Sequence, residues 1–295
     1  MVKVTLSEKD IQLLNLLSQV GVVRPKQSKI VYGDVSRYHL RRIEKLVAAE
    51  ILIRDHGYIR PTATGLTKAG IMISPLRMER YRYKEHSLAV ELMSQLPDWI
   101  PTYARELKQK SQVQRGSRIG VTIKKDTRQY AVYIIADNPK QITLRQICTE
   151  MSELSMAGIK HVLIFCTHTT TLNTFAQALS KPPESLTECC LLPYPAGIEY
   201  FKRQSSLEFQ MFINDHIPGV KASTLSFVDY QVRRIYISVL LSNDLVKICS
   251  LVKYATSAKE REKFQCAAIR SPGQELNIPG VQVIYDEPPI HHAVA

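Results

Sequence analysis

The sequence of 295 residues predicts an α+β protein in two parts, and three observations support this. The first 61 residues show three helical patterns followed by a hairpin pattern. Strand and helix patterns alternate after residue 102. The charge is also divided, because residues 1–128 hold 24 Lys and Arg against 12 Asp and Glu, whereas residues 129–295 hold 15 of each. The whole net charge of +12 therefore lies in the first part, which indicates a surface for a polyanion.

The first part begins with three predicted helices. Ser7 is a good N-cap, apolar residues follow at helical spacing, and Gly21 is expected to end the first helix. A short second helix is expected over residues 24–30, with a proline in its first turn. The third helix is expected from about residue 35 to residue 50. Its apolar positions Leu40, Ile43 and Val47, with Leu46 beside them, are three or four residues apart.

A β-hairpin is predicted directly after the third helix. Residues 51–54 and 58–61 are rich in β-branched and aromatic side chains, and Gly57 lies in the turn between them. Helix, helix, helix, hairpin is the order of a winged helix-turn-helix. The predicted boundaries are residues 1–73 for this domain, 74–101 for a basic linking helix and 102–295 for an α/β domain.

The basic face of the third helix predicts sequence-specific binding of double-stranded DNA. In a winged helix this helix lies in the major groove, where Arg can contact O6 and N7 of guanine together. Lysines of the second helix and basic residues of the wing would contact the backbone or the minor groove. The predicted DNA-binding residues are Lys26, Lys29, Ser36, Arg37, Tyr38, Arg41, Arg42, Lys45, Arg54, His56 and Arg60. A homodimer is expected, because two half-sites multiply specificity.

The second part reads as an α/β domain. Strands are expected at residues 102–107, 118–123, 130–135, 161–166 and 235–241, and helices at residues 142–156, 171–179 and 243–254. Residues 271–295 are rich in Pro and Gly and are expected to form a loosely packed end.

Three segments resemble the replication-relaxation family of plasmid and mobile-element proteins. They are residues 41–54, 66–70 and 85–90, and the similarity covers about residues 6–170. The resemblance implies a winged helix joined to a domain similar to the restriction-endonuclease fold. It also implies a role in replication, DNA transfer or transcriptional control of a plasmid, phage or other mobile element, with possible replication or transfer proteins as partners.

The same resemblance predicts that the second domain is degenerate and not an enzyme. A metal-dependent nuclease of this fold needs carboxylates on its strands, but the corresponding positions read Arg118-Ile119 and residues 130–135, which contain no acidic residue. Only Asp137 and Lys140 remain nearby. The rival function is a metal-dependent nuclease or nicking enzyme that uses carboxylates outside the motif, such as Asp126, Asp137 and Glu150. A further rival is a protein-interaction module.

The remaining composition predicts a cytoplasmic protein without cofactor or metal. The six cysteines form no C-x-x-C pair, so we expect buried, reduced thiols. No apolar run approaches the roughly 20 residues of a membrane span, and the start of the chain lacks the apolar core of a signal peptide.

Overall fold

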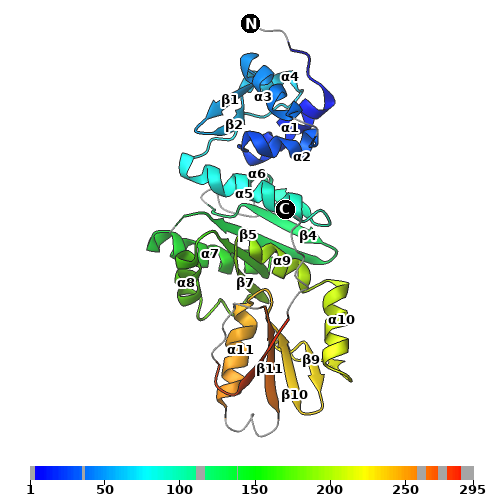
Figure 1. The fold of residues 1–295 in the computed structure, drawn as a ribbon. Coiled ribbons are helices and arrows are strands. Elements are labelled where there is room, and N and C mark those ends of the chain that lie inside the picture. The colour runs from blue at the N-terminus through cyan, green and yellow to red at the C-terminus, as the bar shows by residue number, and fades with distance from the viewer. Residues whose placement is uncertain are drawn as a thin grey trace. The chain divides into compact units, whose positions relative to one another are not determined.

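The protein has a mixed α and β fold, as predicted, in two compact units, Met1–Ala136 and Asp137–Ala295 (Figure 1). The computed structural model describes residues 4–34, 37–110, 117–137, 139–257, 264–271 and 278–286. The boundary between the units falls after residue 136, whereas the sequence suggested boundaries after residues 73 and 101. None of the described helices is long and apolar enough to cross a membrane.

The first unit begins with the predicted order of helices and hairpin. Its first elements are α1 (Glu8–Val20), η1 (Pro25–Ser28), α2 (Lys29–Tyr32), α3 (Tyr38–Ala48), β1 (Leu52–Asp55), β2 (Tyr58–Pro61) and α4 (Ala63–Lys68). The strands β1 and β2 pair antiparallel, with Asp55 opposite Tyr58. The third helix is shorter than the predicted 35–50, because the backbone leaves the helix after Ala48 and Glu50 has a φ of 57°.

Local sequence signals set the ends of these elements. Ser7 caps α1, and its side chain and that of Asp10 bond each other's backbone amides in a capping box. Gly21 ends α1 with a φ of 85°. At the hairpin turn His56 and Gly57 both have positive φ, which is the geometry of a two-residue turn of type I′. The predicted N-cap, helix end and hairpin turn are therefore confirmed.

An apolar core joins α1, α3, the hairpin and α4. Leu14, Leu17, Ile43, Leu46 and Leu66 are among its fully buried side chains. The helix α4 packs directly on the backbone before β1. A Cβ atom on Gly65 would lie 2.1 Å from the carbonyl oxygen of Ile51, so only glycine fits at this contact.

The rest of the first unit differs from the prediction chiefly in two places. Its elements are η2 (Arg80–Arg82), α5 (Tyr83–Gln95), β3 (Ile100–Tyr103), α6 (Ala104–Gln109), β4 (Val121–Lys125) and β5 (Arg128–Ile135). The predicted linking helix begins only at Tyr83. The strand predicted at residues 102–107 is wrong beyond Tyr103, because the helix-forming residues from Ala104 onward make α6. The strands β3, β4 and β5 pair antiparallel in sequence order.

The second unit contains both helices and strands. Its elements are α7 (Gln141–Met156), β6 (His161–Cys166), α8 (Thr169–Ala178), β7 (Glu188–Pro193), α9 (Ala196–Arg203), α10 (Leu207–His216), β8 (Lys221–Ala222), β9 (Tyr230–Val232), β10 (Ile235–Val239), α11 (Leu245–Thr256), β11 (Gln265–Arg270) and β12 (Val281–Tyr285). The strands β6 and β7 are parallel neighbours. A five-stranded sheet follows in the order β12-β11-β10-β9-β8, with β10, β11 and β12 parallel.

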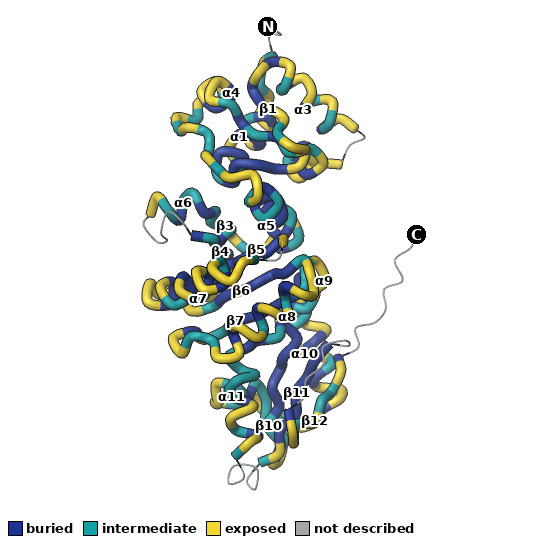
Figure 2. The backbone as a smooth tube through the Cα atoms, turned by 90° about the vertical axis from the view of Figure 1, so that its left-hand side faces the viewer, coloured by how far each residue is buried: buried dark blue, intermediate teal, exposed yellow. Residues whose placement is uncertain are grey.

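The five-stranded sheet has an apolar core on each face. Phe209 and Ile213 of α10 pack with Ile237 of β10 in one core. Leu251 and Ala255 of α11 pack with Ala268 of β11 in the other, and Figure 2 shows these strands as largely buried. The prediction of a loosely packed end after residue 271 is wrong for β12, which pairs with β11. Residues 272–277 and 287–295 of that segment lie outside the described part of the chain.

Candidate nucleic-acid interface

The helix α3 has one buried face and one charged, exposed face. His39, Ile43 and Leu46 are buried, at spacings of four and three residues. Of the predicted apolar positions, Ile43 and Leu46 are buried, whereas Leu40 and Val47 are only half-buried. The exposed side chains of α3 and its first turn include Arg37, Tyr38, Arg41, Glu44 and Lys45.

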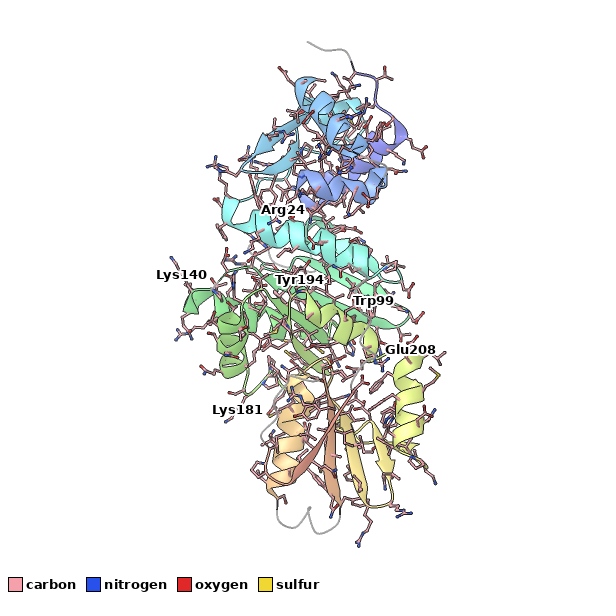
Figure 3. All side chains as sticks on the ribbon, viewed as in Figure 1. Arg24, Trp99, Lys140, Lys181, Tyr194 and Glu208 are labelled. Carbon is pink, nitrogen blue, oxygen red and sulfur yellow. The ribbon has the colours of Figure 1, made fainter. Side chains whose placement is uncertain are left out.

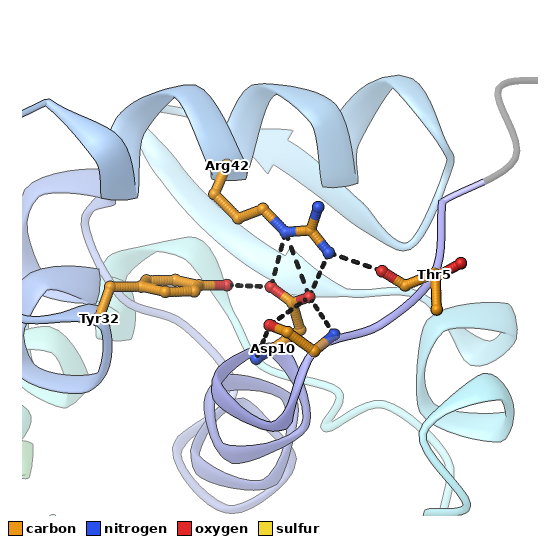
Figure 4. Close-up of polar contacts among 5 residues, drawn as sticks. Thr5, Asp10, Tyr32 and Arg42 are labelled. Carbon is orange, nitrogen blue, oxygen red and sulfur yellow. Dashed lines mark hydrogen bonds and ion pairs between the residues drawn. The ribbon is translucent and has the colours of Figure 1, made fainter.

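Arg42 lies on the inward side of α3, contrary to its predicted place on the DNA-binding face. Its guanidinium forms an ion pair with Asp10, and the Arg42 side chain is only 16% exposed (Figure 4). The Nε atom lies 3.0 Å from Asp10 Oδ1, and Nη2 also donates to the carbonyl oxygen of Thr5 at 2.8 Å. Arg42 therefore stabilises the fold internally, because its hydrogen-bonding groups are directed to α1 and to the residues before α1.

The carboxylate of Asp10 connects α1, α2 and α3. It accepts hydrogen bonds from the hydroxyl of Tyr32 at 2.6 Å and from the backbone amide of Ser7 at 2.7 Å, besides those from Arg42. Burial raises the pKa of Asp10, but the hydrogen bonds from Arg42, Tyr32 and Ser7 outweigh it and hold the pKa below its ordinary value. The carboxylate is thus charged at neutral pH and fixes how α3 lies on α1.

Arg60 of the hairpin, which the sequence also placed among the DNA-binding residues, is likewise turned inward. Its Nη1 donates to Asp55 Oδ2 at 3.1 Å and to the Tyr83 hydroxyl at 2.7 Å, and its side chain is 20% exposed. The Tyr83 hydroxyl donates to Asp55 in turn, and this bond, followed by that from Arg60, lowers the pKa of Asp55. Arg60 therefore fastens the hairpin to α5.

The other predicted residues that the structure describes are exposed on the first unit. We call them the α3–wing surface: Lys26, Lys29, Arg37, Tyr38, Arg41, Lys45, Arg54 and His56. Ser36 lies outside the described residues. Two of these cations have loose acidic neighbours, with Lys29 Nζ 3.9 Å from Asp34 and Arg54 Nη2 3.8 Å from Glu44. Exposed pairs of this length contribute little, so phosphate oxygens can replace the carboxylates.

Two arginines near the hairpin were not predicted. Arg80 is 71% exposed, and its Nε lies 3.8 Å from Asp55 Oδ1 at the end of β1. The exposed Arg24 places its guanidinium 5.9 Å from the centre of the Tyr58 ring on β2 (Figure 3). Both lie far from the hairpin in sequence, so only the fold brings them to it. They extend the positive charge beside the hairpin.

Two positions at which the resemblance to a nuclease would require carboxylates hold buried apolar or aromatic side chains. Ile119 and Tyr133 are both fully buried in the first unit. Among the residues that the structure describes, no group of three or more His, Cys, Asp or Glu side chains is placed to hold a metal ion. All six cysteines are free thiols, and burial raises the pKa of Cys166 to about 12. Four of the cysteines are buried, as predicted, whereas Cys148 and Cys249 are only half-buried.

Comparison with known proteins adds no assignment. No protein-family model, no curated protein and no solved structure matches the chain. The resemblance to the replication-relaxation family stays a prediction.

Proposed function

We propose that this protein binds double-stranded DNA through the α3–wing surface. In this proposal residues 1–73 act as a winged helix-turn-helix, with α3 in the major groove and the β1–β2 hairpin as the wing. On the basis of the family resemblance, we further propose that such binding serves replication, DNA transfer or transcriptional control of a plasmid, phage or other mobile element. A homodimer would present two such surfaces to two half-sites, and the protein would act without catalysing DNA cleavage.

The observation that carries the proposal is the division of α3. Its buried face is fixed to the core by Ile43 and Leu46 and to Asp10 by Arg42, so the helix has a defined orientation. Its opposite face exposes cations, and the unit that holds it contains the whole excess of positive charge. A rigid helix with an exposed basic face meets both needs of groove binding, which are position and charge.

The exposed residues divide into two expected roles. Arg37 and Arg41 occupy the first turns of α3 or the position just before it, where side chains can reach base edges in the major groove. Lys26 and Lys29 lie on η1 and α2 and are expected to contact phosphates. Loss of an Arg–guanine contact costs about 1–3 kcal/mol and relaxes one base position, whereas loss of a phosphate contact weakens binding to all sequences alike.

The test begins by selecting preferred duplexes for the full-length chain from a random pool. The affinity for a selected duplex is then measured by fluorescence anisotropy from 50 to 300 mM salt. We expect an affinity that falls steeply with salt, because Lys and Arg release counterions from phosphates. Arg41→Ala is expected to weaken binding about 5- to 150-fold and to relax specificity at one position.

Two matched variants sharpen this test. Lys124→Ala removes an exposed cation of the same unit on β4 and is expected to leave binding within about twofold. Lys29→Ala is expected to weaken selected and unrelated duplexes equally. Failure to bind any duplex at 50 mM salt would refute the proposal. Equal losses of affinity in Arg41→Ala and Lys124→Ala would also contradict a specific role for α3.

A further inference from the structure

A large cavity lies within the second unit, between α8, β7, α11 and the loop that joins α8 to β7. Its volume is about 1400 Å³, which exceeds the roughly 300–1,000 Å³ of typical small-molecule sites. Its apolar wall includes Leu172 and Ala176 of α8, Leu191 of β7, and Ile248 and Val252 of α11. Val252 is 36% exposed, so the cavity opens to solvent beside α11.

The charged lining of the cavity is predominantly positive. Arg270, Lys181 and Lys253 line it, and Glu184 is the one carboxylate among its described lining residues. Lys181 and Lys253 are exposed, and Figure 3 labels Lys181 on the loop after α8, near the beginning of α11. Arg270, at the end of β11, is only 3% exposed. The cations therefore occupy both the solvent side and the buried side of one cavity.

One partner of the buried cation is a neutral side chain. Arg270 Nη2 donates to Asn243 Oδ1 at 2.7 Å, and Asn243 Nδ2 donates to the carbonyl oxygen of Leu191 at 3.0 Å. Burial lowers the pKa of Arg270 to about 10, so the group remains a cation at neutral pH although it has lost much of its hydration. An anion that approaches such a group is attracted more strongly than one in bulk water.

We propose that this cavity binds a small carboxylate with an apolar body. The carboxylate would lie toward the arginine and the lysines, and the apolar body would cover the side chains of α8, β7 and α11. The described lining residues include no glycine, whereas phosphate groups are typically cradled by glycine-rich backbone. The apolar area of the wall gives an apolar body most of its binding energy, which a small hydrophilic anion would not gain. This inference does not depend on DNA binding.

The test titrates the full-length protein with octanoate and 2-naphthoate by isothermal calorimetry. The matched probes 1-octanol and octylammonium carry the same chain as octanoate without the negative charge. We expect saturable binding of one molecule of at least one carboxylate per chain. For octanoate we expect an affinity at least tenfold above that of octylammonium and several-fold above that of octanol. Absence of saturable binding for both carboxylates would overturn the proposal, as would equal affinities for octanoate and octylammonium.

Variants then assign the binding to this cavity. The double variant Lys181→Gln/Lys253→Gln changes two exposed side chains and is expected to weaken carboxylate binding about five- to tenfold. Lys140→Gln removes an exposed lysine of the same unit that does not line the cavity, and it should leave binding unchanged. Ala176→Trp places a large side chain in the cavity and is expected to abolish binding. Unchanged binding in both cavity variants would refute the assignment.

A thiol of the cavity gives an independent, local measurement. Cys249 lines the cavity, whereas Cys148, which is also half-buried, does not. A bound carboxylate is expected to slow alkylation of Cys249 by N-ethylmaleimide, measured by mass spectrometry, and to leave the rate at Cys148 unchanged. Equal protection of both cysteines would indicate a general stabilisation and would contradict binding in this cavity.

Discussion

Mild acid is expected to destabilise the first unit through His86. This residue of α5 is 5% exposed, and its Nδ1 lies 3.0 Å from the carbonyl oxygen of Val20. That contact needs a proton on Nδ1, which leaves Nε2 of the neutral ring without a hydrogen-bond partner among the described residues. Burial, with smaller effects of Arg82 and Lys108, lowers the pKa of His86 from 6.5 to about 3.

The sign and size of the effect follow from this pKa. Below pH 6.5 the unfolded chain takes up a proton at His86, whereas the folded chain stays neutral there until about pH 3. Each pH unit within this window therefore removes about 1.4 kcal/mol from the free energy of unfolding. Between pH 8 and pH 5 the accumulated loss is about 2 kcal/mol, a large part of the stability of an ordinary domain.

The sequence supplies a reporter for this unit. Trp99 is the one tryptophan of the chain, and its ring centre lies 5.5 Å from that of Tyr130. Urea unfolding followed by tryptophan fluorescence at pH 5 and pH 8 thus measures the first unit. Asp10 and Asp55 do not disturb the comparison, because their lowered pKa values make them lose stability only at more acidic pH.

A non-titrating variant isolates the contribution of His86. In His86→Asn the side-chain amide can replace Nδ1 as donor to Val20, so we expect a variant that is less stable at pH 8 but loses about 2 kcal/mol less than the wild type on acidification. His56→Asn, at an exposed position of the same unit, controls for the loss of a histidine side chain. The same pH dependence in His86→Asn and in the wild type would refute the reasoning.

Three further predictions concern packing and chemistry. Arg42→Gln should lower the free energy of unfolding of the first unit by about 3–5 kcal/mol, because it leaves the buried Asp10 charge without its ion-pair partner. Arg41→Gln should change this free energy by less than about 0.5 kcal/mol. Similar losses in urea titrations of both variants would contradict an internal role for Arg42. Gly65→Ala should lower the free energy of unfolding by about 1–3 kcal/mol or more, because the new methyl group would meet the Ile51 carbonyl oxygen. Gly120→Ala, whose new methyl group would have its nearest contact at 3.6 Å, should lower it less. The reverse order of the two losses would disprove the close approach at Gly65. The pure protein should not nick supercoiled plasmid with Mg²⁺ or Mn²⁺, and nicking that Asp137→Ala abolishes would support the nuclease alternative.

Elements with local signals could be predicted from the sequence. The N-cap Ser7, the end of α1 at Gly21 and the hairpin turn at Gly57 depend on residues within a few positions of one another. The strand wrongly predicted at residues 102–107 also contains local signals, and these signals indicate a helix. Ala104 to Gln109 show no alternation of apolar and polar residues, and the pair Glu106 and Lys110, at 2.6 Å, has helical spacing.

The direction of the basic side chains could be predicted only in part. His39, Arg42, Ile43 and Leu46 follow the spacing of one helical face, so the sequence did contain a signal that Arg42 faces inward. Its partner could not be predicted, because Asp10 lies on another helix 32 positions earlier. The pairing of Arg60 with Tyr83 and the position of Arg80 beside the hairpin depend equally on contacts that sequence periodicity does not contain.

The hydrogen bond from Arg42 to the carbonyl oxygen of Thr5 has a practical consequence. The backbone just before α1 belongs to the support that orients α3 (Figure 4). An affinity tag, fluorescent protein or surface linker fused directly before Thr5 would act on the same guanidinium that holds the exposed helix in place. An affinity measured with such a fusion would therefore include the effect of the fused group on the orientation of α3. A label on an exposed side chain of β4, such as Lys124, leaves this support untouched.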